Sequence, residues 1–198
     1  MDLPSVPEDA PPLAVDLDVT LTDDRRALDP RVMRVRRAWP APVVIATGKS
    51  MPYPVALCEF LAIEQLVVAE NGGVVLAGRD TVRIEGDREA ATAVADAYRA
   101  EGYELGWGDA DLANRWRETE LAVAREQPRE PLDRIAGNHG LVVVDTGYAY
   151  HVKSPAADKG TGLDAVATEL DRSPDAFLAV GDSENDVPTF EAAGLSVA

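Results

Sequence analysis

Four short runs of apolar residues recur along the chain, and each run ends in a group of small polar or acidic residues. They occupy positions 13–15, 43–46, 66–69 and 176–180. Runs of this length that are apolar at every position are typical of strands buried on both faces of a parallel sheet. Segments with a helical spacing of apolar residues separate them. This alternation predicts an α/β fold, with a Rossmann-like parallel sheet and helices on both of its faces.

The middle third of the chain has a different pattern. An alanine-rich helix is expected at 87–100 and a second helix at 128–136, with strands at 120–124 and 141–145. These elements predict a small α+β insertion, which we place at 81–151, after the third strand of the sheet.

The remaining segments complete the predicted domain organisation. The core domain is expected at 13–80 and 152–198, with a last strand at 195–198. Residues 1–12 contain four prolines and three acids and no periodic apolar pattern. Such a segment cannot bury enough apolar surface to order itself, so a loose N-terminal extension is expected.

The charge of the chain limits its partners. Its 198 residues include 35 acidic and 19 basic residues, for a net charge of −16, and a phosphate backbone would be repelled by such a surface. Lysine occurs only at Lys49, Lys153 and Lys159. An acidic, lysine-poor surface suits concentrated salt, where screening removes the self-repulsion. We therefore hypothesise a halophilic source. A protein that is fully stable and active in dilute buffer but loses its activity in molar KCl would contradict this hypothesis.

Two further features bear on the location of the protein. Cys58 is the single cysteine, so an internal disulfide is excluded and a reducing cytoplasm is expected. No apolar run reaches the roughly 18–20 residues that a membrane crossing needs. The sequence predicts a cytoplasmic protein without a membrane partner, and it carries no signal for an oligomeric state.

Two aspartates follow the first apolar run. Asp16 and Asp18 are separated by one residue, so both side chains are expected to face one crevice where the strand ends. Two carboxylates at this spacing raise each other's pKa unless a cation keeps both ionised. The pair therefore indicates either a site for a hard metal or a nucleophile with an acid/base partner.

The other apolar runs end in residues that complete such a site. The carboxyl ends of parallel strands share one edge of the sheet, where ligands bind in open α/β folds. An oxygen-rich set without nearby His or Cys favours Mg²⁺ over zinc. Lys159, together with a hydroxyl and free backbone N–H groups, suits a phosphoryl group. The residues expected at this edge besides the first two aspartates are Thr47, Gly48, Asn71, Asp182, Asn185 and Asp186.

These motifs carry a family resemblance. Asp-Leu-Asp-Val-Thr at 16–20, Thr-Gly at 47–48, Lys159 and Gly-Asp-Ser-Glu-Asn-Asp at 181–186 resemble, in order and spacing, the four motifs of the haloacid dehalogenase superfamily of phosphotransferases. The insertion lies at the position where members of the Cof and sucrose-phosphatase branch have an α/β cap. In its short length it is most similar to the cap of archaeal phosphoglycolate phosphatases. The family commonly has glycine where this chain has Val19. It also usually continues beyond the position of Ala198, so we expect a core closed differently or a piece of a longer chain.

The resemblance implies a role for each residue. Asp16 would attack phosphorus and form an aspartyl phosphate, and Asp18 would protonate the leaving oxygen and later activate water. The implied substrate-binding residues are Thr47, Gly48, Lys159 and Asn185. The implied Mg²⁺ ligands are Asp16, the backbone carbonyl of Asp18, Asp182 and, directly or through water, Asp186.

Several functions fit these motifs. The leading one is a Mg²⁺-dependent phosphatase of a small phosphorylated metabolite, with 2-phosphoglycolate as the best single candidate. Alternatives are a sugar-phosphate phosphatase or phosphomutase, a phospho-acceptor module and a non-catalytic phosphate-binding protein.

Residues outside the motifs have simpler interpretations. Cys58 is expected in the core, and His139 and His151 lack a third ligand for a metal. Trp107 and Trp116 fit either the core of the insertion or the mouth of the substrate site. Lys49 is the better candidate for a substrate contact among the lysines outside the motifs, because it follows the Thr-Gly motif.

Overall fold

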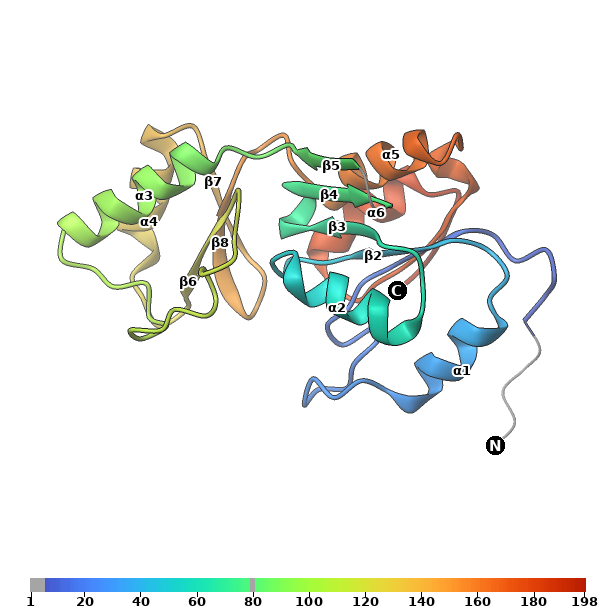
Figure 1. Ribbon diagram of the computed structural model, residues 1–198. Coiled ribbons are helices and arrows are strands. Elements are labelled where there is room, and N and C mark those ends of the chain that lie inside the picture. Colours follow the sequence, from blue (N-terminus) through green and yellow to red (C-terminus); the bar gives the residue numbers. More distant parts are fainter. Residues whose placement is uncertain (1–5, 79–80) are drawn as a thin grey trace.

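A seven-stranded sheet forms the larger of two lobes (Figure 1). The structure is a computed structural model that describes residues 6–78 and 81–198. The strand order is β10-β9-β1-β2-β3-β4-β5. The parallel strands are β1 (Leu13–Val15), β2 (Val43–Ala46), β3 (Leu66–Ala69), β9 (Leu178–Val180) and β10 (Leu195–Val197). The antiparallel strands are β4 (Val74–Ala77) and β5 (Thr81–Ile84).

Helices cover both faces of this sheet, which confirms the predicted α/β fold. Cys58 of α2 (Pro52–Leu61) is fully buried against Ile45 and Val67 on one face, as expected for a core residue. On the other face, Leu163 of α5 (Lys159–Glu169) packs with Val44 and Val68. The remaining helices of the large lobe are α1 (Pro30–Ala38), α6 (Val187–Ala192) and the 3-10 turns η1 (Glu70–Gly72), η2 (Pro174–Ala176) and η3 (Glu184–Asp186).

The close packing of α5 on the sheet depends on a glycine. A Cβ on Gly162 would lie 2.3 Å from Cγ1 of Val68 on β3, which is shorter than van der Waals contact permits. The Gly162→Ala variant is therefore expected to lose about 1–3 kcal/mol of unfolding free energy, because α5 or β3 must shift. Urea denaturation measures the loss. Gly137→Ala on α4 (Arg129–Asn138), where the added Cβ has nothing within 4 Å, is the matched control, and an equal loss in both variants would contradict the packing argument.

A three-stranded antiparallel sheet forms the smaller lobe. It consists of β6 (Leu121–Ala124), β7 (Val142–Asp145) and β8 (Ala149–Lys153), in the order β6-β8-β7. Helices α3 (Arg88–Ala100) and α4 (Arg129–Asn138) cover the face of the sheet that is turned away from the large lobe (Figure 1). Their apolar side chains share one core with the sheet, including Tyr98, Leu132 and Val152.

The sheets give the course of the chain near the predicted domain boundaries. β5 belongs to the large sheet although it begins at Thr81, and β8 continues to Lys153. The chain thus passes between the sheets a few residues after each predicted boundary, and the division into domains stays a prediction.

Part of the predicted N-terminal extension is anchored. Of residues 1–12, positions 1–5 lie outside the described residues. The carbonyl of Pro11 accepts a hydrogen bond of 3.0 Å from the indole of Trp39, and that of Pro12 accepts one of 2.8 Å from the backbone of Leu178. Residues 11–12 are therefore tied to the large lobe.

Within the described residues, every helix is too short or too polar to cross a bilayer.

Candidate active site

The polar residues at the ends of the parallel strands meet at one edge of the large sheet. Asp16 follows β1, Thr47 follows β2, Asn71 follows β3 and Gly181 follows β9. Because β1 lies between β2 and β9, its first aspartate is central in this row. The structure therefore brings together the motifs that the sequence placed at this edge.

A buried lysine lies between two of the aspartates. Lys159 Nζ donates to Oδ1 of Asp16 at 2.7 Å and to Oδ1 of Asp186 at 2.6 Å, and only 1% of its surface is exposed. It is the first residue of α5, whose N-cap Asp158 accepts a hydrogen bond from the Thr161 backbone. This cap fixes the start of the helix, and so it holds Lys159 at the sheet edge, between Asp16 and Asp186.

The environment of Asp16 shifts its ionisation. Burial raises the pKa of this carboxyl, Lys159 opposes the rise and Asp186 adds to it, so that the pKa is raised to about 6. Burial is the largest of these causes. The cluster also holds more negative than positive charge, because the three carboxylates of Asp16, Asp182 and Asp186 lie around one ammonium. The formal sum over these four groups is −3 + 1 = −2.

The donor set fits a divalent cation. One carboxylate oxygen from each of Asp16, Asp182 and Asp186 lies within 4.8 Å of the others. A hard cation with a charge of two would cancel the surplus of negative charge, and Mg²⁺ prefers such oxygen ligands. The side chain of Asp18 is not part of this cluster in the described residues, and the expected ligand role of its backbone carbonyl stays a prediction.

The loop after β9 is organised by one of these aspartates. Oδ2 of Asp186 accepts hydrogen bonds of 3.1 Å from the backbone N–H groups of Asp182 and Ser183 and from the Ser183 hydroxyl. The hydroxyl of Thr20 donates to Oδ1 of Asp182 at 3.1 Å. These bonds join the first and the last motif across the sheet edge.

Asp18 lies apart from the buried lysine. Its Oδ2 is 2.9 Å from Nζ of Lys49, and its Oδ1 is buried without a hydrogen-bond partner in the described part of the chain. An unsatisfied buried oxygen is costly, so it is available to a ligand. The next residue, Val19, has a φ of 65°, in the left-handed region that favours glycine. This conformation explains why the family commonly has glycine there.

The predicted phosphate-binding residues lie beside the aspartates. Thr47 is fully buried and its hydroxyl accepts a hydrogen bond of 3.1 Å from the Lys49 backbone. The absence of a side chain at Gly48 lets the Asn71 side chain lie close to the backbone, because a Cβ at Gly48 would lie only 3.0 Å from Oδ1 of Asn71. That oxygen accepts a hydrogen bond of 3.0 Å from Nδ2 of Asn185. The amide of Asn185 is therefore engaged with the protein in this structure.

The small lobe contributes residues that sequence reasoning did not assign to the site. A cavity of about 340 Å³ lies over the catalytic edge, and its lining includes Asp16, Asp18, Arg117 and His151. Nothing in the sequence distinguishes Arg117 from the other arginines, and His151 carries no sequence signal for substrate binding. Both reach the site through the docking of two lobes, which has no local sequence signal.

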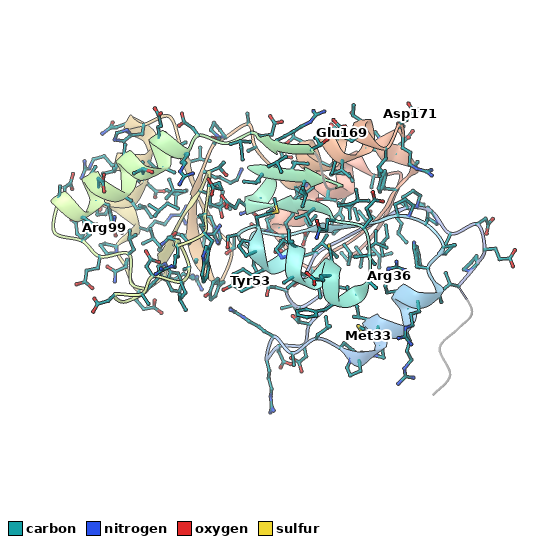
Figure 2. All side chains as sticks on the ribbon, viewed as in Figure 1. Met33, Arg36, Tyr53, Arg99, Glu169 and Asp171 are labelled. Carbon is teal, nitrogen blue, oxygen red and sulfur yellow. The ribbon has the colours of Figure 1, made fainter. Side chains whose placement is uncertain are left out.

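The two tryptophans have different surroundings. Trp107 packs against the core of the small lobe and its indole donates to the Ala122 carbonyl at 2.8 Å. Trp116 is 43% exposed and lines a neighbouring groove of about 670 Å³ together with Tyr53. Figure 2 shows Tyr53 on α2, at the side of the large lobe that faces the small lobe. His139 is exposed at the end of α4.

Comparisons with known proteins agree with the motifs. A family described as haloacid dehalogenase-like hydrolase matches residues 122–198. A phosphoglycolate phosphatase of Haloarcula marismortui is 62% identical over 191 residues, which cover 96% of this chain and 84% of that protein. One from Natronomonas pharaonis is 58% identical and covers 94% of this chain and 83% of its own length. These sources are halophilic archaea, which agrees with the hypothesis drawn from the acidic, lysine-poor composition.

Solved structures give the same picture of the fold. The crystal structure of Thermoplasma acidophilum 0175 has a TM-score of 0.78 and 25% identity, and the match covers 92% of this chain and 81% of that one. A haloacid dehalogenase-like hydrolase from Bacteroides thetaiotaomicron has a TM-score of 0.72 and 16% identity, with coverages of 94% and 86%. The likeness extends over both lobes.

Proposed function

Because the chain belongs to the haloacid dehalogenase-like hydrolases and is a phosphoric monoester hydrolase, we propose that it hydrolyses 2-phosphoglycolate to glycolate and phosphate. The substrate is proposed from the phosphoglycolate phosphatases of similar sequence. The observation that carries the proposal is the buried cluster in which Lys159 joins Asp16 to Asp186. Such a cluster suits the attack of a carboxylate on a phosphate ester.

We propose that Asp16 is the nucleophile and Asp18 the proton carrier. An oxygen of Asp16 attacks phosphorus while the bond from phosphorus to the ester oxygen breaks, and Asp18 gives its proton to that oxygen. Asp18 then takes a proton from water, and the water attacks the phosphorus of the aspartyl phosphate. Phosphate leaves and both carboxyl groups return to their first state. The unpaired Oδ1 of Asp18 supports this role.

The remaining motif residues bind and position the phosphoryl group. In the proposal, Lys159 balances the charge on Asp16 and on the phosphoryl oxygens, while Thr47 and the backbone N–H of Gly48 donate to those oxygens. Asn185 contributes an amide whose Oδ1 lies 3.4 Å from Nζ of Lys159. Lys49 keeps its place beside Asp18, close to the leaving group.

Members of this family generally use Mg²⁺, and the acidic cluster fits it. We propose that the carboxylates of Asp16, Asp182 and Asp186 and the backbone carbonyl of Asp18 hold the ion. When bound, it would neutralise the phosphoryl oxygens, so that an anionic nucleophile can approach.

Phosphate release from a panel of phosphate esters tests the proposal. In molar KCl with Mg²⁺, 2-phosphoglycolate is expected to give a higher kcat/KM than sugar phosphates, and EDTA is expected to stop turnover. The Asp18→Asn variant is expected to lose about 10²–10⁴-fold in kcat, because it cannot donate a proton. A preference for a sugar phosphate would assign the alternative substrate class, and undiminished turnover in EDTA would contradict the metal.

A further inference from the structure

The small lobe places two basic side chains opposite the catalytic edge. Arg117 and His151 line the cavity of about 340 Å³ whose other wall includes Asp16 and Asp18. The aspartates and the motif residues account for a phosphoryl group at the large lobe. The basic side chains face the part of a substrate that extends away from it.

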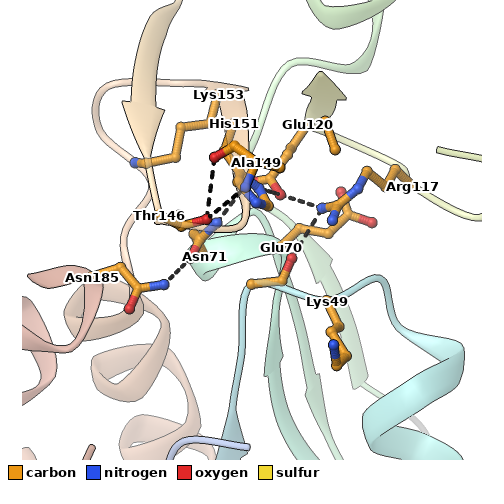
Figure 3. A network of polar contacts seen from close by, with 12 residues as sticks. Lys49, Glu70, Asn71, Arg117, Glu120, Thr146, Ala149, His151, Lys153 and Asn185 are labelled. Carbon is orange, nitrogen blue, oxygen red and sulfur yellow. Dashed lines mark hydrogen bonds and ion pairs between the residues drawn. The ribbon is translucent and has the colours of Figure 1, made fainter. Parts of the chain in front are cut away.

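A buried carboxylate holds both of these side chains (Figure 3). The Glu120 side chain is 0% exposed, and its Oε1 is 2.6 Å from Nδ1 of His151. Nη1 of Arg117 donates to the same oxygen, and Nδ2 of Asn71 donates to Oε2 at 2.9 Å. Burial raises the pKa of Glu120, but the charges of His151 and Arg117 outweigh it and the pKa is lowered to about 2. The Glu120 carboxylate is therefore ionised, and it orients the side chains of both Arg117 and His151.

The contacts of Arg117 leave part of its guanidinium free. Its Nε donates to the Ala113 carbonyl at 2.9 Å and Nη1 donates to the Gly48 carbonyl at 3.0 Å. Only 7% of the side chain is exposed, and no hydrogen bond to residues 6–78 or 81–198 uses Nη2. With the other nitrogens fixed, Nη2 is preorganised to bind an acceptor in the cavity that Arg117 lines.

His151 has a similar arrangement. Because Nδ1 faces Glu120, Nε2 is the ring nitrogen that remains for the cavity, and it donates a hydrogen bond there in the imidazolium form, which carries a proton on both nitrogens. The imidazole is 4% exposed, so a hydrogen bond made there would be largely shielded from water.

The other two cations of the cavity wall each contact another residue of the same wall. Nζ of Lys49 lies 2.9 Å from Asp18, and the guanidinium of Arg26 lies 4.1 Å above the centre of the Tyr148 ring. Of the basic residues of this wall, Arg117 and His151 are the two whose side chains Glu120 fixes in place.

We propose that Arg117 and His151 form the subsite that binds the carboxylate of the substrate, while Glu120 is a positioning residue behind them. This inference rests on the proposed hydrolysis of 2-phosphoglycolate. A carboxylate has two oxygens that accept charge-assisted hydrogen bonds, so one can accept from Nη2 of Arg117 and the other from Nε2 of His151. The cavity thus binds an ester with an anion at each end, with the phosphate against the large lobe and the carboxylate against the small one.

A pair of substrates isolates this subsite. 2-Hydroxyethyl phosphate has the same chain length as 2-phosphoglycolate but carries a neutral hydroxymethyl group in place of the carboxylate. The ratio of kcat/KM for the two esters therefore measures recognition of the carboxylate, with phosphoryl transfer in common. Arg117→Met is expected to lower this ratio about 10–100-fold, mainly by raising KM for 2-phosphoglycolate, as the loss of a charged hydrogen bond would.

Three further variants complete the test. His151→Asn keeps a donor towards Glu120 and removes Nε2, so it is expected to lower the ratio without unfolding the protein. Glu120→Gln is expected to lower the ratio through KM, with kcat less affected. Arg134→Met on α4, which removes an exposed arginine paired with Glu101, is the matched control and is expected to keep the wild-type ratio.

The outcomes separate the subsite from the function. A folded Arg117→Met with the wild-type ratio would overturn the subsite, and so would a wild-type enzyme that does not prefer 2-phosphoglycolate to its neutral analogue. If Arg117→Met does not fold, an unchanged ratio in His151→Asn overturns it instead. Failure of the wild-type enzyme to cleave 2-phosphoglycolate faster than Asp16→Asn would overturn the proposed function, and the subsite with it.

Discussion

Asp16→Asn is expected to abolish phosphate release, with a loss on the order of 10⁴-fold or more in kcat. The amide has nearly the shape of the carboxylate but cannot attack phosphorus. Its oxygen can still accept the hydrogen bond from Lys159, which in the wild type is 2.7 Å long. The measurement is phosphate release with Mg²⁺ in molar KCl. Release at the normal rate would end the proposed mechanism.

The same variant has a second readout, in stability. The folded-state pKa of Asp16 is about 6, above its ordinary value of 3.8, so the folded protein holds this proton more tightly than the unfolded chain does. In the presence of a chelator, its contribution to stability is complete below about pH 4 and declines as the pH rises through 6. Asp16→Asn should remove this decline. Asp164→Asn, on the exposed side of α5, should keep both the activity and the decline.

Lys159→Met is expected to lower the free energy of unfolding by about 3–5 kcal/mol, because it leaves buried carboxylates without their cation. The ammonium is 1% exposed and pairs with both Asp16 and Asp186. Urea denaturation in EDTA measures the loss, and added Mg²⁺ should reduce it. Activity should fall by about 10²–10³-fold, since a charged contact to the phosphoryl group also disappears.

A double variant shows whether charge is the cause. Combining Lys159→Met with Asp16→Asn removes one of the stranded carboxylates, so the double variant should be more stable than the sum of the single losses predicts. Lys153→Met is the matched control. Within residues 6–78 and 81–198, its ammonium donates only to the carbonyls of Ser154 and Ala157, so a loss of about 1–2 kcal/mol is expected. Strict additivity, or equal losses for both lysines, would contradict the explanation.

The catalytic edge could be predicted because it depends on local patterns. Each apolar run forms a strand by its own composition, and the polar residues after it follow at a fixed spacing. Parallel strands then bring their carboxyl ends to one edge whatever their exact order. This is why Asp16, Thr47 and Asp182 could be placed together, and why the acidic cluster could be expected to need a cation.

The conformations of single residues at this edge had weaker signals. Val19, Glu70 and Asn71 have positive φ values of 65°, 50° and 50°. The first and second are unusual residue types for such a conformation. Glu70 is held by residues far away in the sequence, because its side-chain carboxylate accepts from the backbone N–H groups of Glu118 and Thr119 at 2.8 Å each.

The sequence by itself determined the α/β fold, the sheet edge and the residues of the four motifs, because these follow from strand composition and short spacings. Only the tertiary structure decided that Lys159 lies between Asp16 and Asp186, and that Arg117 and His151 enter the cavity around Glu120. Those contacts depend on how helix α5 packs and how the small lobe docks on the large one. Docking is the sum of many weak contacts between residues far apart in the chain, so no local pattern specifies it.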